Sequence, residues 1–320
     1  MTDKLILTQP TGKLGSATLR SLLSHSLIPP TSLVLSTSSS PSDPRLSTYA
    51  SKGITVKHAS YDSPDSMVSA WAGCTRLFLI SSPAIALDFH DAPSGSGREK
   101  HHIAAIKAAN EAGVRHVYYA SLAFGSNSKA GVMVAHNRTE DFLAEYTAKG
   151  QPGAGMTYTI IREGLYNESW PLYLGQYEMD KDDREVVPVG GDNKISWTGI
   201  EDLGLANAII LGDEPSKWAG KMFYLSAGRG NARTLEEVAG IVSRIRGRKV
   251  GIKVVEQEEY ERYCIEERGQ DAGNARWWSK SYVALRHNEC EIQDKTFEEL
   301  LARMGKKPKT LETTMEEMLK

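Results

Sequence analysis

Two side chains in this sequence, His136 and Tyr166, have the chemistry to move a proton. An imidazole titrates near neutral pH, and a phenol can protonate an oxygen that gains negative charge. His136 lies in the helical pattern of residues 132–140, whereas Tyr166 follows the apolar run of residues 158–162. The pattern at 132–140 contains no Tyr-x-x-x-Lys pair, in which a lysine lowers the pKa of a tyrosine acid. We therefore predict His136 and Tyr166 as the catalytic residues.

Both residues also have an ordinary structural interpretation. His136 could pair with Glu140 one helical turn later, and the hydroxyl of Tyr166 could bond to the backbone. Ser121 is expected to donate a hydrogen bond to a ligand rather than to act as a nucleophile, because no Gly-x-Ser-x-Gly motif surrounds it.

The elements that must position these side chains begin with a strand, a turn and a helix. Residues 5–7 are apolar, residues 11–15 form the turn TGKLG, and a helical pattern follows over 16–23. A helix N-terminus offers free N–H groups and a positive dipole end to a pyrophosphate, so this order predicts a dinucleotide-binding loop. The first glycine of the usual spacing is replaced by Gln9, which Pro10 is expected to hold in an extended conformation. This departure favours weak or selective cofactor binding.

The end of the second predicted strand indicates which dinucleotide is bound. No acidic residue stands there to accept the ribose 2′-hydroxyl; Ser36 and Thr37 are present instead, with Arg45 a few residues later. Hydroxyls and an arginine suit a 2′-phosphate, so NADP(H) is favoured over NAD(H). The alternative is a serine-rich turn with a solvated arginine.

Composition excludes several classes of protein. The chain has 320 residues and a formal net charge of -2, which gives no basic excess for nucleic acid. Its apolar runs are too short to span a membrane, and from the residues before the first strand we expect no secretory signal peptide. The three cysteines are scattered and His101 is adjacent to His102, so we expect a cytoplasmic protein without a metal site.

Strand and helix signals alternate along the first half of the chain. This pattern, with strands that are apolar throughout, predicts a doubly wound parallel α/β fold of the Rossmann type. Strands are predicted at 5–7, 32–36, 54–56, 76–81, 115–120, 158–162 and 222–226. Further helices are predicted at 66–72, 100–112, 136–146 and 234–246, the last with a capping box between Thr234 and Glu237.

The rest of the chain predicts a second, smaller and mostly helical lobe. We assign residues 1–165 and 198–250 to the dinucleotide-binding domain, and residues 166–197 and 251–320 to a substrate-binding lobe rich in Trp and Tyr. Trp170 is the best candidate for an aromatic substrate pocket, and its alternative is a place in the core.

Eight segments together resemble the NmrA-like group of atypical short-chain dehydrogenase/reductases, which includes quinone-oxidoreductase-like and isoflavone-reductase-like proteins. They occur in family order and cover most of the chain. The segments are TGKLG (11–15), ITVKHASYDSPDSM (54–67), RLFLISSP (76–83), GVRHVYYASL (113–122), HNRTEDFL (136–143), YTIIREGLYNESW (158–170), ISWTGIEDLG (195–204) and WWSKSYVALRHNE (277–289).

The resemblance, taken with the patterns above, implies a set of ligand contacts. The residues expected to bind the cofactor are Thr8, Thr11, Gly12, Lys13, Leu14, Gly15, Ser36, Thr37, Arg45, Ser60, Tyr61, Ser81, Ser82, Pro83, Ser121, Leu122, His136, Glu163, Gly164, Leu165 and Tyr166. Those expected to contact the substrate are Phe124, Asn167 and Trp170. Ser60 replaces an aspartate that the family usually places beside the adenine.

These observations favour an NADP(H)-dependent oxidoreductase, active as a monomer or homodimer. Its substrate would be a hydrophobic small molecule such as a quinone, carbonyl, imine or conjugated alkene, with specialised metabolism as the expected setting. One alternative is a regulator that senses NAD(P) and binds a protein partner without turnover. Another is an isomerase or cyclase that uses the same cleft without net redox chemistry.

Overall fold

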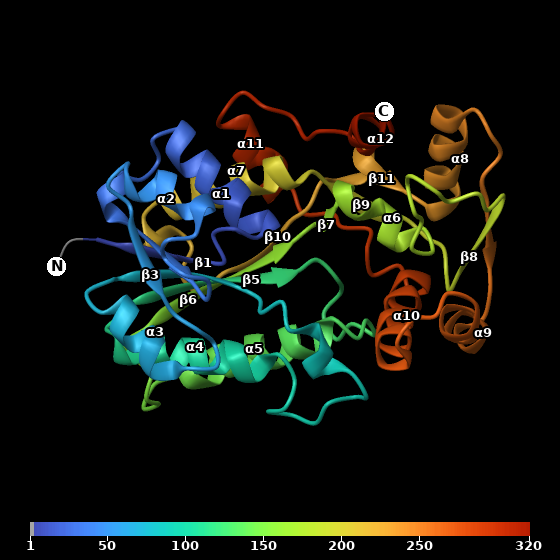
Figure 1. Cartoon of the computed structure of the whole chain (residues 1–320). Coiled ribbons are helices and arrows are strands. Elements are labelled where there is room, and N and C mark those ends of the chain that lie inside the picture. The colour runs from blue at the N-terminus through green and yellow to red at the C-terminus, as the bar shows by residue number, and fades with distance from the viewer. Residues whose placement is uncertain (1–2) are drawn as a thin grey trace.

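The computed structural model describes residues 3–320, and its largest element is a seven-stranded parallel sheet (Figure 1). The strands in spatial order are β10 (Met222–Leu225), β6 (Thr157–Glu163), β5 (His116–Leu122), β4 (Arg76–Ile80), β1 (Leu5–Thr8), β2 (Leu33–Thr37) and β3 (Thr55–His58). The chain order reverses between β1 and β4, which is where doubly wound sheets bind ligands. The predicted fold class is confirmed.

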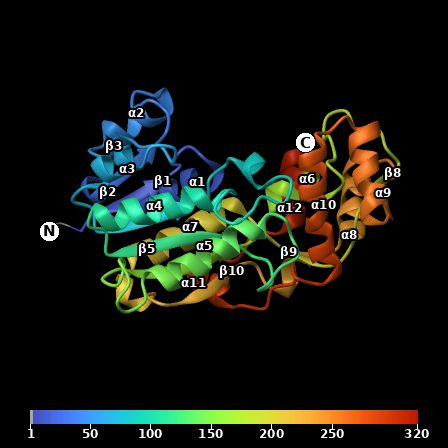
Figure 2. The same cartoon turned by 90° about the horizontal axis from the view of Figure 1, so that it is seen from below.

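Helices cover both faces of this sheet, above and below the strands in Figure 1, and Figure 2 looks onto the face that carries α4 and α5. One face carries α1 (Lys13–Ser24), α2 (Pro44–Ala50), α7 (Ile200–Gly212) and α11 (Thr296–Ala302). The other carries α3 (Pro64–Trp71), α4 (Glu99–Glu111) and α5 (Met133–Tyr146). Along β1, Leu5 and Leu7 pack on the first face and Ile6 on the second. Burial on both faces explains why the strand is apolar throughout.

The smaller lobe lies beyond the carboxyl edge of the large sheet (Figure 1). Its helices are α6 (Trp170–Tyr173), α8 (Leu235–Arg246), α9 (Gln257–Arg262), α10 (Ala272–Arg286) and α12 (Leu311–Leu319). It also holds a three-stranded sheet of β11 (Ala232–Arg233), β9 (Ile195–Thr198) and β7 (Leu165–Tyr166). The parallel strands β12 (Gly251–Val254) and β8 (Val186–Val189) form a further pair.

Two segments lie in the opposite lobe from the one expected. The capping box of Thr234 and Glu237 begins α8, but this helix contributes Val238 and Val242 to the smaller lobe's core rather than to the Rossmann-type domain. Conversely, α11 packs Phe297 and Leu301 against the large sheet's core. The apolar side chains on each helix, not its place in the chain, decide which lobe it joins. Within residues 3–320, no helix has the length and apolar character needed to cross a membrane.

Candidate functional site

Two adjoining cavities lie at the carboxyl ends of the large sheet's strands, beside the reversal of strand order. The cavity near β2 has a volume of about 290 Å³, and the cavity near β5 and β6 has a volume of about 360 Å³. Gln9, Gly12 and Pro83 line both, so the two form one groove that passes the N-terminus of α1.

The turn before α1 differs from its prediction at Gln9. The backbone of Gln9 has φ 50°, a left-handed conformation, rather than the extended one expected before a proline. Its carbonyl accepts a hydrogen bond from Gly12 N at 3.0 Å, and its side-chain Nε2 donates to the carbonyls of Ile80 and Ser81 at 3.0 and 2.6 Å. These bonds offset the strain, so Gln9 adopts the backbone conformation that a glycine would supply freely.

The first turn of α1 is open to an anionic group. No side chain caps this helix, and its first turn contains no acidic residue. A β-carbon on Gly15 would lie 2.2 Å from the carbonyl oxygen of Gln9, so only glycine allows this close approach of turn and helix. Lys13 adds a positive charge to the cavity wall. The free N–H groups, the helix dipole and this lysine suit a pyrophosphate.

The cavity near β2 is lined by hydroxyl groups. Its described lining residues carry no positive charge and include Thr8, Thr11, Ser36, Thr37, Ser38, Ser39 and Tyr61. Arg45 is not among them, contrary to expectation: its guanidinium bonds to both oxygens of Asp43, at 3.1 and 2.6 Å. These hydrogen bonds lower the pKa of Asp43 to about 2. Ser60 also lies outside the lining and accepts a bond from the backbone of Asp62.

The cavity near β5 and β6 brings together most residues predicted for the nicotinamide end. Its lining includes Lys13, Leu14, Gly15, Ser81, Ser82, Pro83, Ser121, Leu122, His136, Glu163 and Tyr166. The register of β5 with β6 explains part of this grouping, because Ser121 pairs with Arg162 and Leu122 pairs with Glu163.

His136 is a buried imidazole in the wall of this cavity. Its partner is Tyr119, whose hydroxyl lies 2.9 Å from His136 Nδ1; Glu140, the partner considered from sequence, pairs with Arg162. Burial, together with the charge of Arg98, lowers the pKa of His136 well below its ordinary value. Burial therefore disfavours the charged form of this imidazole, and its role as a catalytic residue stays a prediction.

Glu163 and Tyr166 are the acids that line the same cavity. Glu163 accepts a hydrogen bond from Asn207 at Oε2, at 3.0 Å, while its buried Oε1 has no partner among the described residues. Burial raises the pKa of Glu163 well above its ordinary value, and burial and the Glu163 carboxyl raise the pKa of Tyr166. Burial therefore favours the protonated form of both groups.

Glu163 makes the stability of the fold depend on pH. Because its pKa is higher in the folded than in the unfolded chain, its contribution is full below the unfolded pKa and is lost as the pH rises through the folded pKa. We expect Glu163→Gln to remove this loss, making the variant more stable than wild type by about 1 kcal/mol or more at alkaline pH. Urea unfolding of both proteins between about pH 5 and pH 9 measures this difference in the free energy of unfolding. The exposed Glu258→Gln is the control, and a wild-type slope in Glu163→Gln would contradict the assignment.

The three residues predicted to contact substrate lie elsewhere. Trp170 and Phe124 are fully buried in the smaller lobe's core, where the ring of Trp170 packs 5.6 Å from that of Tyr177. Asn167 donates to the carbonyls of Lys309 and Thr310 and so holds the segment before α12. These positions are structural, which corrects the sequence-based interpretation.

Two more predicted cofactor contacts are also outside the cavity lining. Leu165 packs in the core of the smaller lobe. Gly164 lies against the Thr198 side chain, where a β-carbon would be only 2.3 Å from Oγ1. Both positions therefore join the two lobes rather than face the groove.

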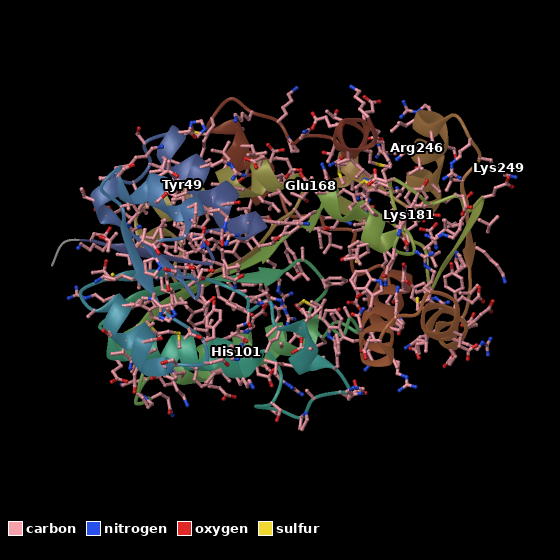
Figure 3. All side chains as sticks on the ribbon, viewed as in Figure 1. Tyr49, His101, Glu168, Lys181, Arg246 and Lys249 are labelled. Carbon is pink, nitrogen blue, oxygen red and sulfur yellow. The ribbon has the colours of Figure 1, made fainter. Side chains whose placement is uncertain are left out.

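A Tyr-x-x-x-Lys spacing does occur in the chain, at Tyr177 and Lys181, outside the segment considered above. Tyr177 is buried and its hydroxyl accepts a bond from Arg248, while the exposed Lys181 pairs with Glu178. Figure 3 shows Lys181 on the smaller lobe, apart from His101 beneath the large sheet. This pair does not contribute to the groove.

Sequence reasoning missed two buried polar residues beside the groove. Arg98 lines it and forms a buried ion pair with Asp88 at 2.7 Å. His102 accepts a hydrogen bond from Ser82 N at 3.0 Å. A signal for His102 was available, because it shares the helical face of Ile106 and Ala109, and a polar residue on an apolar face requires a partner.

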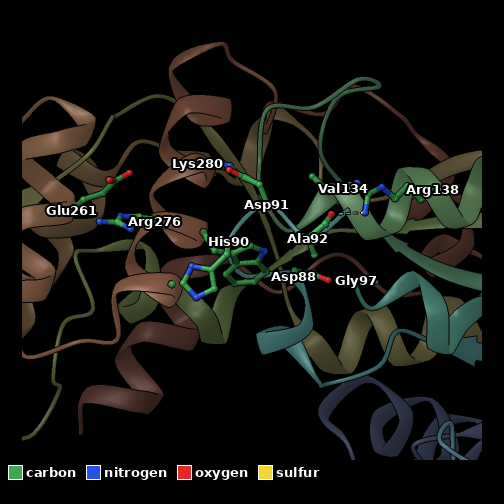
Figure 4. A pocket seen from close by; sticks show the side chains of 13 residues that line it. Asp88, His90, Asp91, Ala92, Gly97, Val134, Arg138, Glu261, Arg276 and Lys280 are labelled. Atoms are coloured by element: carbon green, nitrogen blue, oxygen red, sulfur yellow. Dashed lines mark hydrogen bonds and ion pairs between the residues drawn. The ribbon is translucent and has the colours of Figure 1, made fainter. Parts of the chain in front are cut away.

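A separate cavity of about 430 Å³ lies between residues 88–97, α5 and α10 (Figure 4). Its lining mixes acids with cations; Arg138 there donates to the Ala92 carbonyl and Lys280 pairs with Asp91. Val134 and Arg138 share one helical face, whereas His136, two residues from each, faces away from them. This cavity is thus distinct from the groove.

Comparison with known proteins agrees with this geometry. Residues 1–317 match the model of the NmrA-like family. The NmrA-like family domain-containing oxidoreductase flvB of Aspergillus flavus is 26% identical over 309 residues, 95% of this chain and 91% of that protein. Quinone oxidoreductase 2 of Escherichia coli is 27% identical over 256 residues, 80% of this chain and 79% of that protein.

Solved structures share the fold over nearly the whole chain. The NADPH complex of quinone oxidoreductase QOR2 from Escherichia coli has a TM-score of 0.78 at 25% identity, covering 99% of this chain and 100% of that chain. The NADP(H) complex of Citrobacter sp. triphenylmethane reductase also has a TM-score of 0.78, at 23% identity and the same coverage. The chain therefore belongs to the NmrA-like family, and the relatives that it resembles are oxidoreductases.

Proposed function

We propose that this protein is an NADP(H)-dependent oxidoreductase that acts on a hydrophobic quinone, carbonyl or imine. The observation that carries the proposal is the groove, which runs from the hydroxyl-lined end of β2, past the uncapped N-terminus of α1, to His136, Glu163 and Tyr166. The relatives that bind NADPH or NADP(H) share this fold.

The residues of the groove fit the parts of a dinucleotide. The first turn of α1 and Lys13 would hold the pyrophosphate, and the hydroxyls of residues 36–39 would face the adenosine ribose. Ser81, Ser121 and His136 border the other end, where a bound nicotinamide would supply or accept a hydride. The absence of an acidic residue at the end of β2 favours NADP(H), because a carboxylate there would repel a 2′-phosphate.

The chain itself supplies an apolar wall and neutral hydrogen-bonding groups. Ile85, Leu122 and Val132 line the cavity near β5 and β6 and would exclude water from a flat substrate. Burial favours the uncharged forms of His136, Glu163 and Tyr166 there. Such a site suits quinones and conjugated imines, which need less acid catalysis than simple carbonyls.

Titration of the purified protein with NADPH and NADH tests the proposal, followed by NADPH oxidation with quinones, imines and carbonyls. We expect NADPH to bind more tightly than NADH and to be oxidised by at least one acceptor class. Failure of both dinucleotides to bind at millimolar concentration would overturn the cofactor assignment. Binding without turnover would overturn the enzyme assignment and favour a dinucleotide-sensing regulator.

The variant Arg45→Met tests the source of the NADPH preference. Asp43 holds the Arg45 guanidinium away from the cavity, so we expect the preference to survive in the variant. Loss of the preference would show that the guanidinium exchanges Asp43 for the 2′-phosphate when NADPH binds.

A further inference from the structure

His136 is one end of a buried chain of hydrogen-bonding side chains. The Tyr119 hydroxyl lies 2.9 Å from His136 Nδ1 and 3.3 Å from His102 Nδ1, and Thr139 Oγ1 lies 2.8 Å from His102 Nδ1. These groups come from α4, β5 and α5, and each residue is 3% exposed or less. Their hydrogen bonds to one another are therefore shielded from bulk water.

A backbone group at the end farthest from His136 sets the direction of these hydrogen bonds. The N–H of Ser82 donates to His102 Nε2 at 3.0 Å, and a backbone amide can only donate. His102 Nε2 is thus unprotonated, and the ring carries its hydrogen on Nδ1. The Thr139 hydroxyl donates its own hydrogen to the Ala135 carbonyl at 2.7 Å. Thr139 Oγ1 therefore accepts a hydrogen bond from His102 Nδ1.

The same reasoning fixes the next two members. Because His102 Nδ1 carries a hydrogen, it cannot accept one from the Tyr119 hydroxyl, and the hydrogen of Tyr119 is left for His136. Of the two ring nitrogens that the Tyr119 hydroxyl contacts, His136 Nδ1 is the closer, at 2.9 Å against 3.3 Å for His102 Nδ1. His136 Nδ1 is then unprotonated, and a neutral His136 carries its hydrogen on Nε2.

We propose that Ser82, His102 and Tyr119 lock His136 in the Nε2–H tautomer, so that this N–H is a fixed donor to the oxygen or nitrogen of the substrate. His136 lines the cavity, and among the described residues its Nε2 has no hydrogen-bond partner. A fixed donor stabilises negative charge that develops on a carbonyl oxygen or imine nitrogen. The identity of the acceptor rests on the proposed function; the tautomer does not. Tyr119 and His102 are positioning residues in this assignment.

The tautomer can be read directly by nuclear magnetic resonance. Long-range proton–nitrogen correlation spectra of protein with isotope-labelled histidine distinguish protonated from unprotonated ring nitrogens, and a His136→Gln variant identifies the signals of His136. We expect a protonated Nε2 in the wild type and a shift toward protonated Nδ1 in Tyr119→Phe. A protonated Nδ1 in the wild type would overturn the proposal, whatever the variants do.

Tyr118→Phe is the matched control. It removes the hydroxyl of the residue next to Tyr119, which is also buried but has no hydrogen-bond partner among the described residues. It should leave the His136 spectrum unchanged. With an acceptor that is turned over, kcat should fall about 10- to 100-fold in Tyr119→Phe, while the Kd for NADPH changes less than about twofold. An unchanged kcat in Tyr119→Phe would contradict the proposal that the fixed His136 tautomer contributes to catalysis. Failure of the wild type to bind NADPH would overturn the proposed function and leave the tautomer assignment standing.

Discussion

Alanine at position 15 is expected to abolish dinucleotide binding. Its β-carbon would lie 2.2 Å from the carbonyl oxygen of Gln9, 2.9 Å from the carbonyl carbon of Gln9 and 3.2 Å from Cδ1 of Ile80. Two of these are backbone atoms, and Gln9 is held in place by its bonds to Gly12, Ile80 and Ser81. The turn must therefore move away from α1. We expect the Kd for NADPH to rise more than about 100-fold and stability to fall by about 1–3 kcal/mol.

Two other glycines provide matched controls. A β-carbon on Gly12 would lie 3.3 Å from the Gln9 oxygen, so Gly12→Ala should weaken binding less than Gly15→Ala. Gly240 lies in α8 with open space around it, and Gly240→Ala should stabilise the helix by about 1 kcal/mol without changing affinity. Calorimetric titration and urea unfolding measure both quantities. Wild-type NADPH affinity in Gly15→Ala would contradict the assigned role of the turn.

The large sheet could be predicted because most of its strands contain a short apolar run. A strand buried on both faces, such as β1, can be recognised from its own run of apolar residues, without knowledge of the strands beside it. The helix α7 gives no such signal, because its residues are buried on nearly every side and show no helical period. The pair of β8 and β12 was also missed, because these short strands meet only through the tertiary fold.

The candidate site also has one part that the sequence predicts and one part that it does not. The turn before α1 is one continuous segment, and its glycine spacing and helix are local features that a sequence displays. The arrangement of Ser82, His102, Tyr119 and His136 draws on four different elements, so no spacing in the chain reveals it. The sequence pattern also did not reveal that Asp43, only two residues away, would bind the Arg45 guanidinium. Arg45 pairs with this carboxylate instead of reaching the groove.

Removal of Arg162 is the second change expected to have a large effect. Its guanidinium forms two hydrogen bonds to the carboxylate of Glu140, at 3.2 and 2.7 Å, and both side chains are buried. The pair joins β6 to α5, and Ser121 of β5 donates to the same carboxylate at 2.5 Å. In Arg162→Met the carboxylate stays buried without its cation. We expect the free energy of unfolding to fall by about 3–5 kcal/mol, measured by urea unfolding.

The double variant separates the cost of an unpaired charge from the value of the pair. Adding Glu140→Met to Arg162→Met removes the buried carboxylate, so much of the lost stability should return. NADPH affinity should be weaker in the double variant than in the wild type, because Ser121 has lost the carboxylate that orients it in the wall of the groove. Arg20→Met breaks an exposed pair with Glu201 and should cost less than about 1 kcal/mol. If Arg162→Met costs no more than Arg20→Met, Glu140 is accommodated without its cation, and the pair does not position Ser121.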